Sequence, residues 1–268
     1  MNRIDKLFKR LKKERKKALI IYLTAGYPSL KATEKLIIEL EKSGADLIEI
    51  GIPFSDPLAD GPTIQKASQY ALSKGVNLKA ILGMVRSVRR KISIPLVFMT
   101  YYNLVMHYGL KKFVRDSKKA GVDGIIIPDL PPEEGKEIVS ASKKEGFDVI
   151  FLAAPTSTKV RLETIASKTS GFIYYVSLTG VTGARKKLPK DITDHVKALK
   201  KITKKPVCVG FGISKPGQAR RISRLADGVI VGSAVIKVIE KNMGKKNLYL
   251  RVGRFVRSLA KAVHGKHR

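Results

Sequence analysis

The stretch AGVDGIIIPDL, residues 120–130, contains the junction that decides the fold. Its Gly121 follows a lysine-bearing helical pattern, where a glycine is the expected C-terminal cap of a helix. An isoleucine-rich run bounded by aspartate and proline follows, as is typical of a buried parallel strand. Similar junctions occur at residues 43–46 (SGAD) and 145–148 (EGFD), each before an apolar run. The chain is therefore predicted to alternate helices with parallel strands.

Short apolar runs of this kind recur along the whole chain. We find eight of them, at residues 19–23, 47–50, 96–99, 124–127, 149–152, 172–176, 207–209 and 228–231. Eight strand and helix units in 268 residues fit a closed (β/α)₈ TIM barrel better than an open doubly wound sheet. No linker divides the chain, so we expect a single TIM-barrel domain over residues 1–268. Residues 3–16 predict an extra N-terminal helix, which we expect at the bottom of the barrel.

The composition limits the classes of protein to which the chain can belong. Its single cysteine, Cys208, cannot form an internal disulfide, and its four histidines show no metal-ligand spacing. The chain has no long apolar segment and no export signal at its start. We therefore expect a cytoplasmic protein without a metal and without a membrane partner.

The formal net charge of +31 is the most unusual feature of the composition. Such a charge attracts nucleic acid, acidic membranes and anionic substrates without selecting among them. The lysine and arginine residues are spread along the chain, mostly at helix faces and helix ends, without the interleaved aromatic residues that single-strand binding needs. We interpret them as a basic, solvated surface and do not expect nucleic acid as a partner; a nucleic-acid-binding barrel is kept as an alternative.

In such barrels the active site lies at the C-terminal ends of the strands. These ends carry no lysine for a Schiff base and no His or Cys cluster for a metal, which leaves carboxylates for acid–base work. Strand alternation turns Glu49 into the barrel mouth if Ile48 and Ile50 face the helices, and burial there should raise its pKa. The alternative is a buried glutamate satisfied by a neighbouring hydroxyl.

A second carboxylate, Asp60, follows a loop that two prolines, Pro53 and Pro57, stiffen. The loop can bring Asp60 back over the mouth, although Asp60-Gly61-Pro62 is by itself also an ordinary turn or helix cap. Glycine-rich segments at 180–183, 210–214 and 232–234 follow the last three predicted strands. Exposed N–H groups at helix N-termini bind phosphate, so these segments predict a phosphate site, with tight turns as the alternative.

Six segments of the chain together resemble one family, the tryptophan synthase α subunits. The most specific is IEIGIPFSDPLADGP at residues 48–62. The others are YLTAGYP at 22–28, MTYYN at 99–103, PDLP at 128–131, YVSLTGVTG at 175–183 and GFGIS at 210–214. The resemblance extends from about residue 18 to the end of the chain.

The resemblance implies a lyase of L-tryptophan biosynthesis that cleaves indole-3-glycerol phosphate to indole and glyceraldehyde 3-phosphate by a retro-aldol reaction. It implies that Glu49 moves protons between the glycerol hydroxyl and indole C3, and that Asp60 accepts the indole N–H. The other implied site residues are Tyr175 near the glycerol part, Tyr22, Ile64, Thr100, Asp129, Thr182 and Phe211 around the substrate, and Gly183, Gly212, Gly232 and Ser233 at the phosphate.

The resemblance also implies a partner, the β subunit, in an α₂β₂ heterotetramer. Pyridoxal phosphate is then expected in the β subunit and no cofactor in this chain, with Pro53 and Asp56 facing the partner. The nearest alternative enzyme is another phosphate-binding barrel, such as indole-glycerol-phosphate synthase or a phosphoribosyl isomerase. Strand-end lysines or a different pair of acids would distinguish these enzymes, and the sequence has neither. The net charge is the one departure from what the family leads us to expect.

Overall fold

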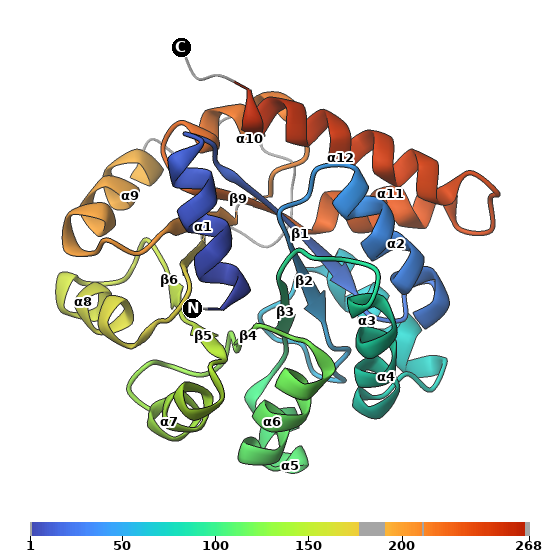
Figure 1. The fold of residues 1–268 in the computed structure, drawn as a ribbon, viewed down its shortest axis with the longest axis horizontal. Helices are drawn as coiled ribbons and strands as arrows, with labels where there is room; N and C mark the ends of the chain where they lie inside the picture. The colour runs from blue at the N-terminus through green and yellow to red at the C-terminus, as the bar shows by residue number, and fades with distance from the viewer. Residues whose placement is uncertain (1, 177–190, 211, 266–268) are drawn as a thin grey trace.

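Parallel strands surround a central axis and form the barrel (Figure 1). The computed structural model describes residues 2–176, 191–210 and 212–265. Within them, one nine-stranded sheet has the order β5-β4-β3-β2-β1-β9-β8-β7-β6. Its strands are β1 (Ala18–Thr24), β2 (Leu47–Gly51), β3 (Leu96–Met99), β4 (Gly124–Ile126), β5 (Asp148–Ile150), β6 (Leu152–Ala153), β7 (Ile173–Val176), β8 (Val207–Gly210) and β9 (Gly228–Val231).

The two edges of this sheet, β5 and β6, are consecutive in the chain, so the barrel is nearly closed. All eight apolar runs are strands, and the prediction of a TIM-like (β/α)₈ fold is confirmed. The run predicted at 149–152 is divided at Phe151 into β5 and β6. It is the only predicted run that the described structure interrupts.

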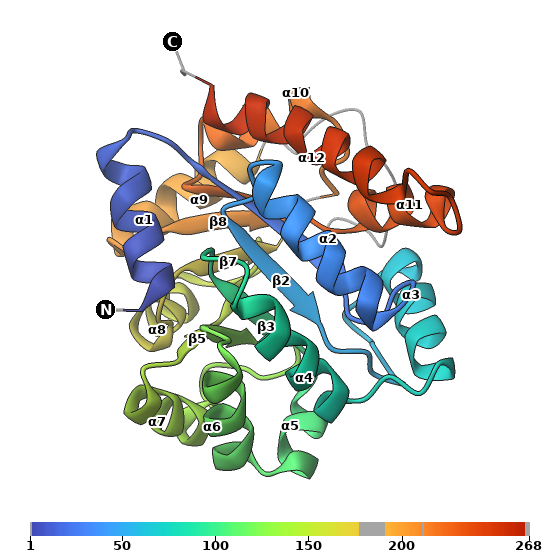
Figure 2. The same ribbon diagram turned by 45° about the vertical axis from the view of Figure 1, so that its right-hand side comes forward.

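Helices surround the barrel on its outer side (Figures 1 and 2). Side chains cap several of their N-termini: Ser29 accepts from the Ala32 N–H, and Asn77 and Thr158 cap in the same way. The helices are α1 (Arg3–Lys13), α2 (Leu30–Lys42), α3 (Pro62–Ser73), α4 (Leu78–Arg89), α5 (Tyr102–Tyr108), α6 (Leu110–Ala120), α7 (Lys136–Glu145), α8 (Lys159–Lys168), α9 (Asp191–Ile202), α10 (Pro216–Ser223), α11 (Ser233–Asn242) and α12 (Leu248–His264).

The buried apolar residues form two layers because strand side chains alternate between the two faces of the sheet. An outer core lies between strands and helices and includes Ile48 and Ile50. An inner core fills the barrel and contains strand residues such as Ile20 and Leu47. The apolar face of α1 belongs to the inner core through Ile4, Leu7, Phe8 and Leu11. Helix α1 therefore closes the barrel at the end where the strands begin, as expected.

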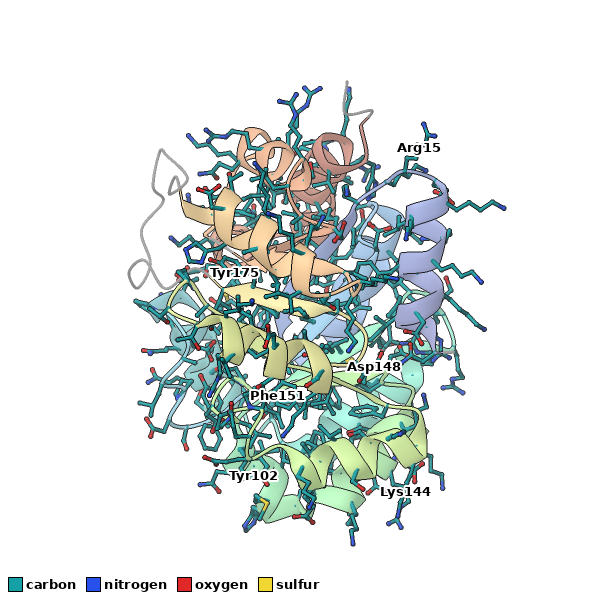
Figure 3. The ribbon with its side chains drawn as sticks, turned by 90° about the vertical axis from the view of Figure 1, so that its left-hand side faces the viewer. Arg15, Tyr102, Lys144, Asp148, Phe151 and Tyr175 are labelled. Carbon is teal, nitrogen blue, oxygen red and sulfur yellow. The ribbon has the colours of Figure 1, made fainter. Side chains whose placement is uncertain are left out.

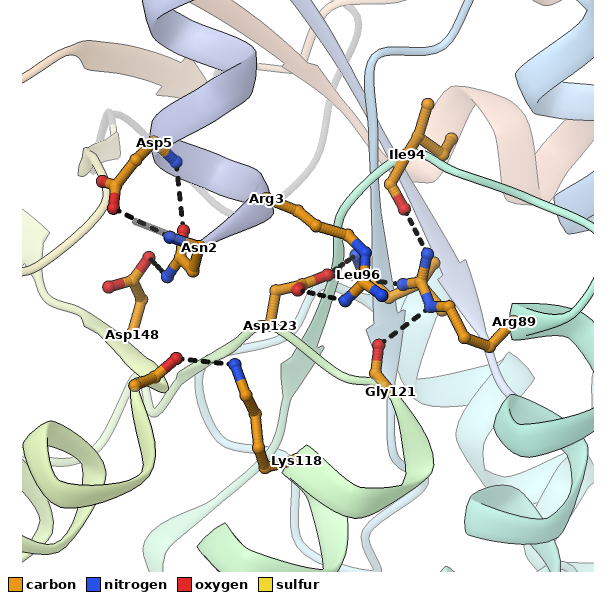
Figure 4. Close-up of polar contacts among 11 residues, drawn as sticks. Asn2, Arg3, Asp5, Arg89, Ile94, Leu96, Lys118, Gly121, Asp123 and Asp148 are labelled. Atoms are coloured by element: carbon orange, nitrogen blue, oxygen red, sulfur yellow. Dashed lines mark hydrogen bonds and ion pairs between the residues drawn. The ribbon is translucent and has the colours of Figure 1, made fainter.

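Aspartates at the strand starts hold this closed end together. Asp123 accepts from the N–H of Leu96 and pairs with Arg3 of α1 at 2.9 Å and with Arg89 of α4 at 3.3 Å (Figure 4). The Asn2 side chain donates to Asp148 in the same region. Two further aspartates repeat the pattern: Asp46 binds the Leu19 N–H and lies 3.7 Å from Arg10, and Asp227 binds the Val207 N–H and pairs with Lys17.

Candidate active site

Glu49 lies inside the barrel, at the end where the strands finish, which we call the mouth. On β2 its neighbours Ile48 and Ile50 belong to the outer core and Leu47 to the inner core, so Glu49 faces inward as predicted. The residue is completely buried, and neither carboxyl oxygen has a hydrogen-bond partner among the described residues. Burial raises the pKa of Glu49 to about 8. The alternative was a glutamate that accepts a hydrogen bond from a neighbouring hydroxyl. The described residues contain no such hydrogen bond to Glu49.

Asp60 is held over the mouth by Tyr101, which follows β3. The Tyr101 hydroxyl donates to Asp60 Oδ2 at 3.0 Å and accepts from the Ala59 N–H at 3.0 Å. Its ring stacks on Phe54, with centroids 5.1 Å apart and planes at 19°. Burial raises the pKa of Asp60 to about 6, and the hydrogen bond from Tyr101 opposes that rise. Tyr101 lies within the MTYYN segment, but no pattern in that segment assigns it a role.

Tyr22 lies opposite Glu49, because the two residues are register partners on β1 and β2. Its hydroxyl is 3.3 Å from Thr24 Oγ1, and a Cβ atom on Gly51 would overlap that hydroxyl. Gly51 therefore leaves the space that the Tyr22 ring occupies. Burial, reinforced by the charges of Asp60 and Glu49, raises the pKa of Tyr22 well above its usual value.

On β7 the structure places two adjacent tyrosines on opposite faces. Tyr174 packs against the inner core, and its pKa is raised by burial and by the charges of Glu49 and Asp60. Tyr175, labelled in Figure 3, belongs to the outer core, where its ring lies 6.3 Å from that of His195 on α9. Strand alternation turns Tyr174 toward the barrel interior and Tyr175 toward the helices, which corrects the expectation that Tyr175 faces the interior of the mouth.

Three of the predicted phosphate contacts, Gly212, Gly232 and Ser233, are described, and they follow β8 and β9 at the same mouth. Gly212 has φ +40°, and a Cβ atom there would meet nothing within 4 Å. Gly232 is the N-cap of α11 and Ser233 its first residue, with no side chain satisfying the helix start. Open backbone N–H groups at a helix N-terminus suit an anion. Gly183, the fourth predicted phosphate contact, lies outside the described residues.

The remaining predicted site residues occupy more varied positions. Thr100 is fully buried, and its hydroxyl has no partner within the described part of the chain. Asp129 is exposed and accepts from the Tyr102 N–H at the start of α5, so it anchors that helix. Ile64 on α3 packs against the outer core, half-buried. Pro53 is buried and Asp56 exposed in the loop before Asp60, whereas Thr182 and Phe211 lie outside the described residues.

The described residues contain no group of three or more His, Cys, Asp or Glu side chains that could hold a metal ion. The mouth contains two carboxyls of different pKa, several tyrosines and the glycines that follow β8 and β9. One carboxyl is protonated and the other ionised near pH 7, which is how a site supplies an acid and a base together.

The family model of the tryptophan synthase alpha chain matches residues 8–264. The chain belongs to this family. It is 53% identical to the tryptophan synthase alpha chain of Geotalea uraniireducens over 99% of this chain and 100% of the relative. The alpha chain of Caldanaerobacter subterraneus subsp. tengcongensis is 49% identical, with 97% of this chain and 98% of the relative covered.

Solved structures of the family agree with the fold. The alpha subunit from Legionella pneumophila superposes with a TM-score of 0.92 at 40% identity, covering 98% of both chains. A chain of Mycobacterium tuberculosis tryptophan synthase gives 0.91 at 37% identity, covering 99% of both.

As a tryptophan synthase alpha chain, the protein is a lyase of tryptophan biosynthesis that cleaves indole-3-glycerol phosphate and works with the β subunit. The alpha chain carries no cofactor, and the pyridoxal phosphate belongs to the β subunit. These matches support neither of the alternatives, a different phosphate-binding barrel or a nucleic-acid-binding barrel.

Proposed function

We propose that Glu49 and Asp60 divide the proton transfers of the cleavage between them. The observation that carries this proposal is the complete burial of Glu49 without a hydrogen-bond partner among the described residues. The charges of both Glu49 and Asp60 raise the pKa values of Tyr22 and Tyr174, which lie beside them. With pKa values of about 8 and about 6, Glu49 starts protonated and Asp60 ionised at neutral pH. Glu49 can therefore act first as an acid and Asp60 first as a base.

The reaction begins with two proton transfers on the indole ring. Asp60 accepts the proton of the indole N–H while the Glu49 carboxyl gives its proton to indole C3, which produces the indolenine form of the substrate. The Glu49 carboxylate then takes the proton of the hydroxyl on the carbon attached to C3. The bond between that carbon and C3 breaks, its electron pair flows into the ring, and the carbon becomes the aldehyde of glyceraldehyde 3-phosphate. Asp60 returns its proton to the ring nitrogen, and indole is released.

Other residues of the mouth position these groups. Tyr101 holds Asp60 and the adjoining loop, as its two hydrogen bonds and its stacking on Phe54 support. Tyr174 takes the place near the glycerol part that the sequence suggested for Tyr175, and Tyr22 borders the indole. Thr100, Ile64 and Asp129 support the walls and the helix start around them.

The substrate phosphate binds at Gly212, Gly232 and Ser233. The open space above Gly212 and the uncapped start of α11, a helix of ten residues, favour an anion there. Binding at this point fixes the glycerol phosphate end of the substrate, so that the scissile bond lies toward Glu49. Gly183, Thr182 and Phe211 complete this part of the proposal from the sequence resemblance.

The β subunit meets the mouth through the loop that carries Pro53 and Asp56, in an α₂β₂ assembly. The same loop exposes Leu58 to 83%, an apolar side chain suited to burial by a partner. We also infer that residues 1–268 form one domain, since α1 contributes to the inner core and α12 packs beside α2. None of the helices in the described ranges is long and apolar enough to cross a membrane. A cytoplasmic location fits a biosynthetic enzyme with one buried, unpaired cysteine.

The test is release of indole from indole-3-glycerol phosphate by the wild type, by Glu49→Gln and by Glu134→Gln, each with and without the β subunit. Glu134 is an exposed glutamate near the mouth and controls for the change in charge. We expect Glu49→Gln alone to lose activity by several orders of magnitude. Retention of activity by Glu49→Gln would remove Glu49 from the mechanism.

A further inference from the structure

Many basic side chains lie at one end of the barrel. Helices in this fold run opposite to the strands they follow, so their C-termini lie beside the strand starts, at the end that α1 closes. Cations are stabilised there by the helix dipole. The last turns of six helices form a basic rim: Arg86 and Arg89 on α4, Lys118 and Lys119 on α6, Lys143 and Lys144 on α7, Lys168 on α8, Lys200 and Lys201 on α9, and Arg220 and Arg221 on α10.

Helix α1 adds charge at the centre of this rim. Nine of the sixteen residues from 2 to 17 are Lys or Arg, and its outward residues are exposed. The side view in Figure 3 shows Arg15 and Lys144 at the end of the molecule where α1 lies, and Tyr102 and Tyr175 toward the other end. The rim and α1 therefore lie on the face opposite the mouth.

Most of these cations are not balanced by acids. Arg3, Lys17, Arg89 and Lys200 pair with the strand-start aspartates. Arg10 and Lys16 also lie within 4.0 Å of a carboxylate oxygen. Within the described ranges, the other basic residues of this face do not; they are Lys6, Lys9, Lys12, Lys13, Arg15, Arg86, Lys118, Lys119, Lys143, Lys144, Lys168, Lys201, Lys204, Lys205, Arg220 and Arg221. The helix dipole explains why a cation suits each position, at about 0.3–1 kcal/mol. It does not explain why so many lack a counter-charge.

Several of these ammonium groups are already held in place. Lys118 donates to the Gly146 carbonyl at 2.7 Å (Figure 4), Lys168 donates to that of Pro132 at 3.1 Å, and Lys205 also binds a backbone carbonyl. A carbonyl leaves the charge of the ammonium uncompensated and two of its protons free. Fixed cations of this kind lose little conformational entropy when they bind an anion.

The rim is also hollowed beside the start of α1. A hollow of about 640 Å³ is lined by lysines from α6, α7 and α8. A second hollow of about 700 Å³ adjoins it and is lined by Lys204 and Lys205. Asp5 and Asp148 line both hollows, and Asp148 is occupied by the Asn2 side chain. Because carboxylates repel an anion, the lysines of the two hollows are the groups that an anion would contact.

The face offers charge without apolar or stacking groups. The large apolar side chains that are exposed in the described structure are Leu58, Met106, Val160 and Leu250, and none belongs to α1 or to the rim. A membrane-binding face needs apolar groups to insert, and a single-stranded nucleic acid needs rings on which bases stack. The rim also curves around α1. A DNA duplex is stiff, with a persistence length of about 150 base pairs, so it can contact only part of the curved rim.

We propose that this basic face, made by α1 and the rim, binds a flexible linear polyphosphate. Such a chain carries closely spaced negative charges, can bend along the rim and has no base that needs stacking. Its binding releases counterions, so the affinity falls steeply with salt.

The test compares two variants that lose the same charge from opposite helix ends. The rim variant changes Lys143, Lys144 and Lys201 of the rim to Gln, together with Lys204, which follows α9 and lines the second hollow. The control changes Lys31, Lys79, Lys111 and Lys159 to Gln; these residues are exposed in the first turns of α2, α4, α6 and α8. Affinity for a linear polyphosphate of defined length is measured by titration calorimetry over a range of salt concentrations. A DNA duplex of equal phosphate number is titrated in parallel.

We expect the rim variant to lose at least tenfold in affinity for polyphosphate and the control less than about twofold. The slope of log K against log salt should also become shallower, by roughly 0.7 for each phosphate that no longer meets a lysine. Equal losses in both variants would assign the binding to net charge and overturn the proposal, as would the absence of binding at physiological salt. Tighter binding of the duplex, with the same dependence on the rim, would overturn the choice of polyphosphate. Indole release should be unchanged in both variants, which separates this result from the proposed roles of Glu49 and Asp60.

Discussion

Replacing Glu49 by Gln should stabilise the protein while it abolishes catalysis, and the gain should depend on pH. The carboxyl has an ordinary pKa of 4.5 in the unfolded chain and a pKa of about 8 in the folded protein, because burial disfavours its charge. Between those values the unfolded chain is ionised and the folded protein protonated. Folding therefore takes up a proton, and the stability of the wild type falls as the pH rises.

The size of the effect follows from the two pKa values. Each pH unit between them costs about 1.4 kcal/mol of folding free energy. The cost is small below pH 5, reaches about 3 kcal/mol at pH 7 and levels off near about 5 kcal/mol above pH 8. Gln has the shape of the protonated acid and cannot ionise, so the folding free energy of Glu49→Gln does not contain this pH-dependent loss. The variant should be more stable than the wild type by slightly less than about 1 kcal/mol at pH 5 and by about 3 kcal/mol at pH 7.

Urea unfolding of both proteins at a series of pH values from 5 to 9 measures the difference directly. Glu145→Gln, which removes an exposed glutamate at the end of α7, controls for the change in net charge. A difference between Glu49→Gln and the wild type that does not vary with pH would refute the reasoning. So would a variant less stable than the wild type at pH 7, because Glu49 would then be ionised and partnered in the folded protein.

Three further substitutions test the geometry of the mouth and of the closed end. Tyr101→Phe removes the hydrogen bond that lowers the pKa of Asp60, so the acid limb of the pH profile of kcat/KM should move to higher pH and kcat/KM at pH 6 should fall about 10-fold or more; an unmoved limb would contradict this role. Tyr174→Phe should lower kcat/KM several-fold, whereas Tyr175→Phe should change only the melting temperature, and the reverse result would restore the original assignment. Asp123→Asn should cost about 3 kcal/mol in urea unfolding, since it leaves the largely buried Arg89 guanidinium without its ion pair; a loss below about 0.5 kcal/mol would show that these pairs do not stabilise the closed end.

The barrel could be predicted from the sequence because buried parallel strands leave a strong signal. Continuous apolar runs between glycine-capped helices located every strand, and the inward direction of Glu49 was predictable because Ile48 and Ile50 flank it. In β7 the sequence does not distinguish the inward from the outward face, because both faces carry apolar or aromatic residues. The direction of its two tyrosines is decided by the register of β7 with its neighbours, which no local pattern contains.

The contact between Tyr101 and Asp60 was beyond prediction for a different reason. The two residues are 41 positions apart and come from loops after different strands. Their meeting depends on how the loop from Gly51 to Asp60 folds back, and the two prolines only indicate that this loop is stiff. A pair of this kind can be proposed once the order of the strands is known, because β2 and β3 are neighbours in the sheet.

The charge distribution shows how topology can create a surface that composition hides. Lysine pairs spaced along the chain looked like a uniformly basic surface, but the common direction of the helices brings their last turns to one face. The acids at that end do not neutralise it, because Asp46, Asp123 and Asp227 bind N–H groups at the strand starts as well as nearby cations. The interior of the closed end is thus paired, and the outer lysines keep their charge. Any anion that this face attracts therefore meets cations which the fold has already brought together.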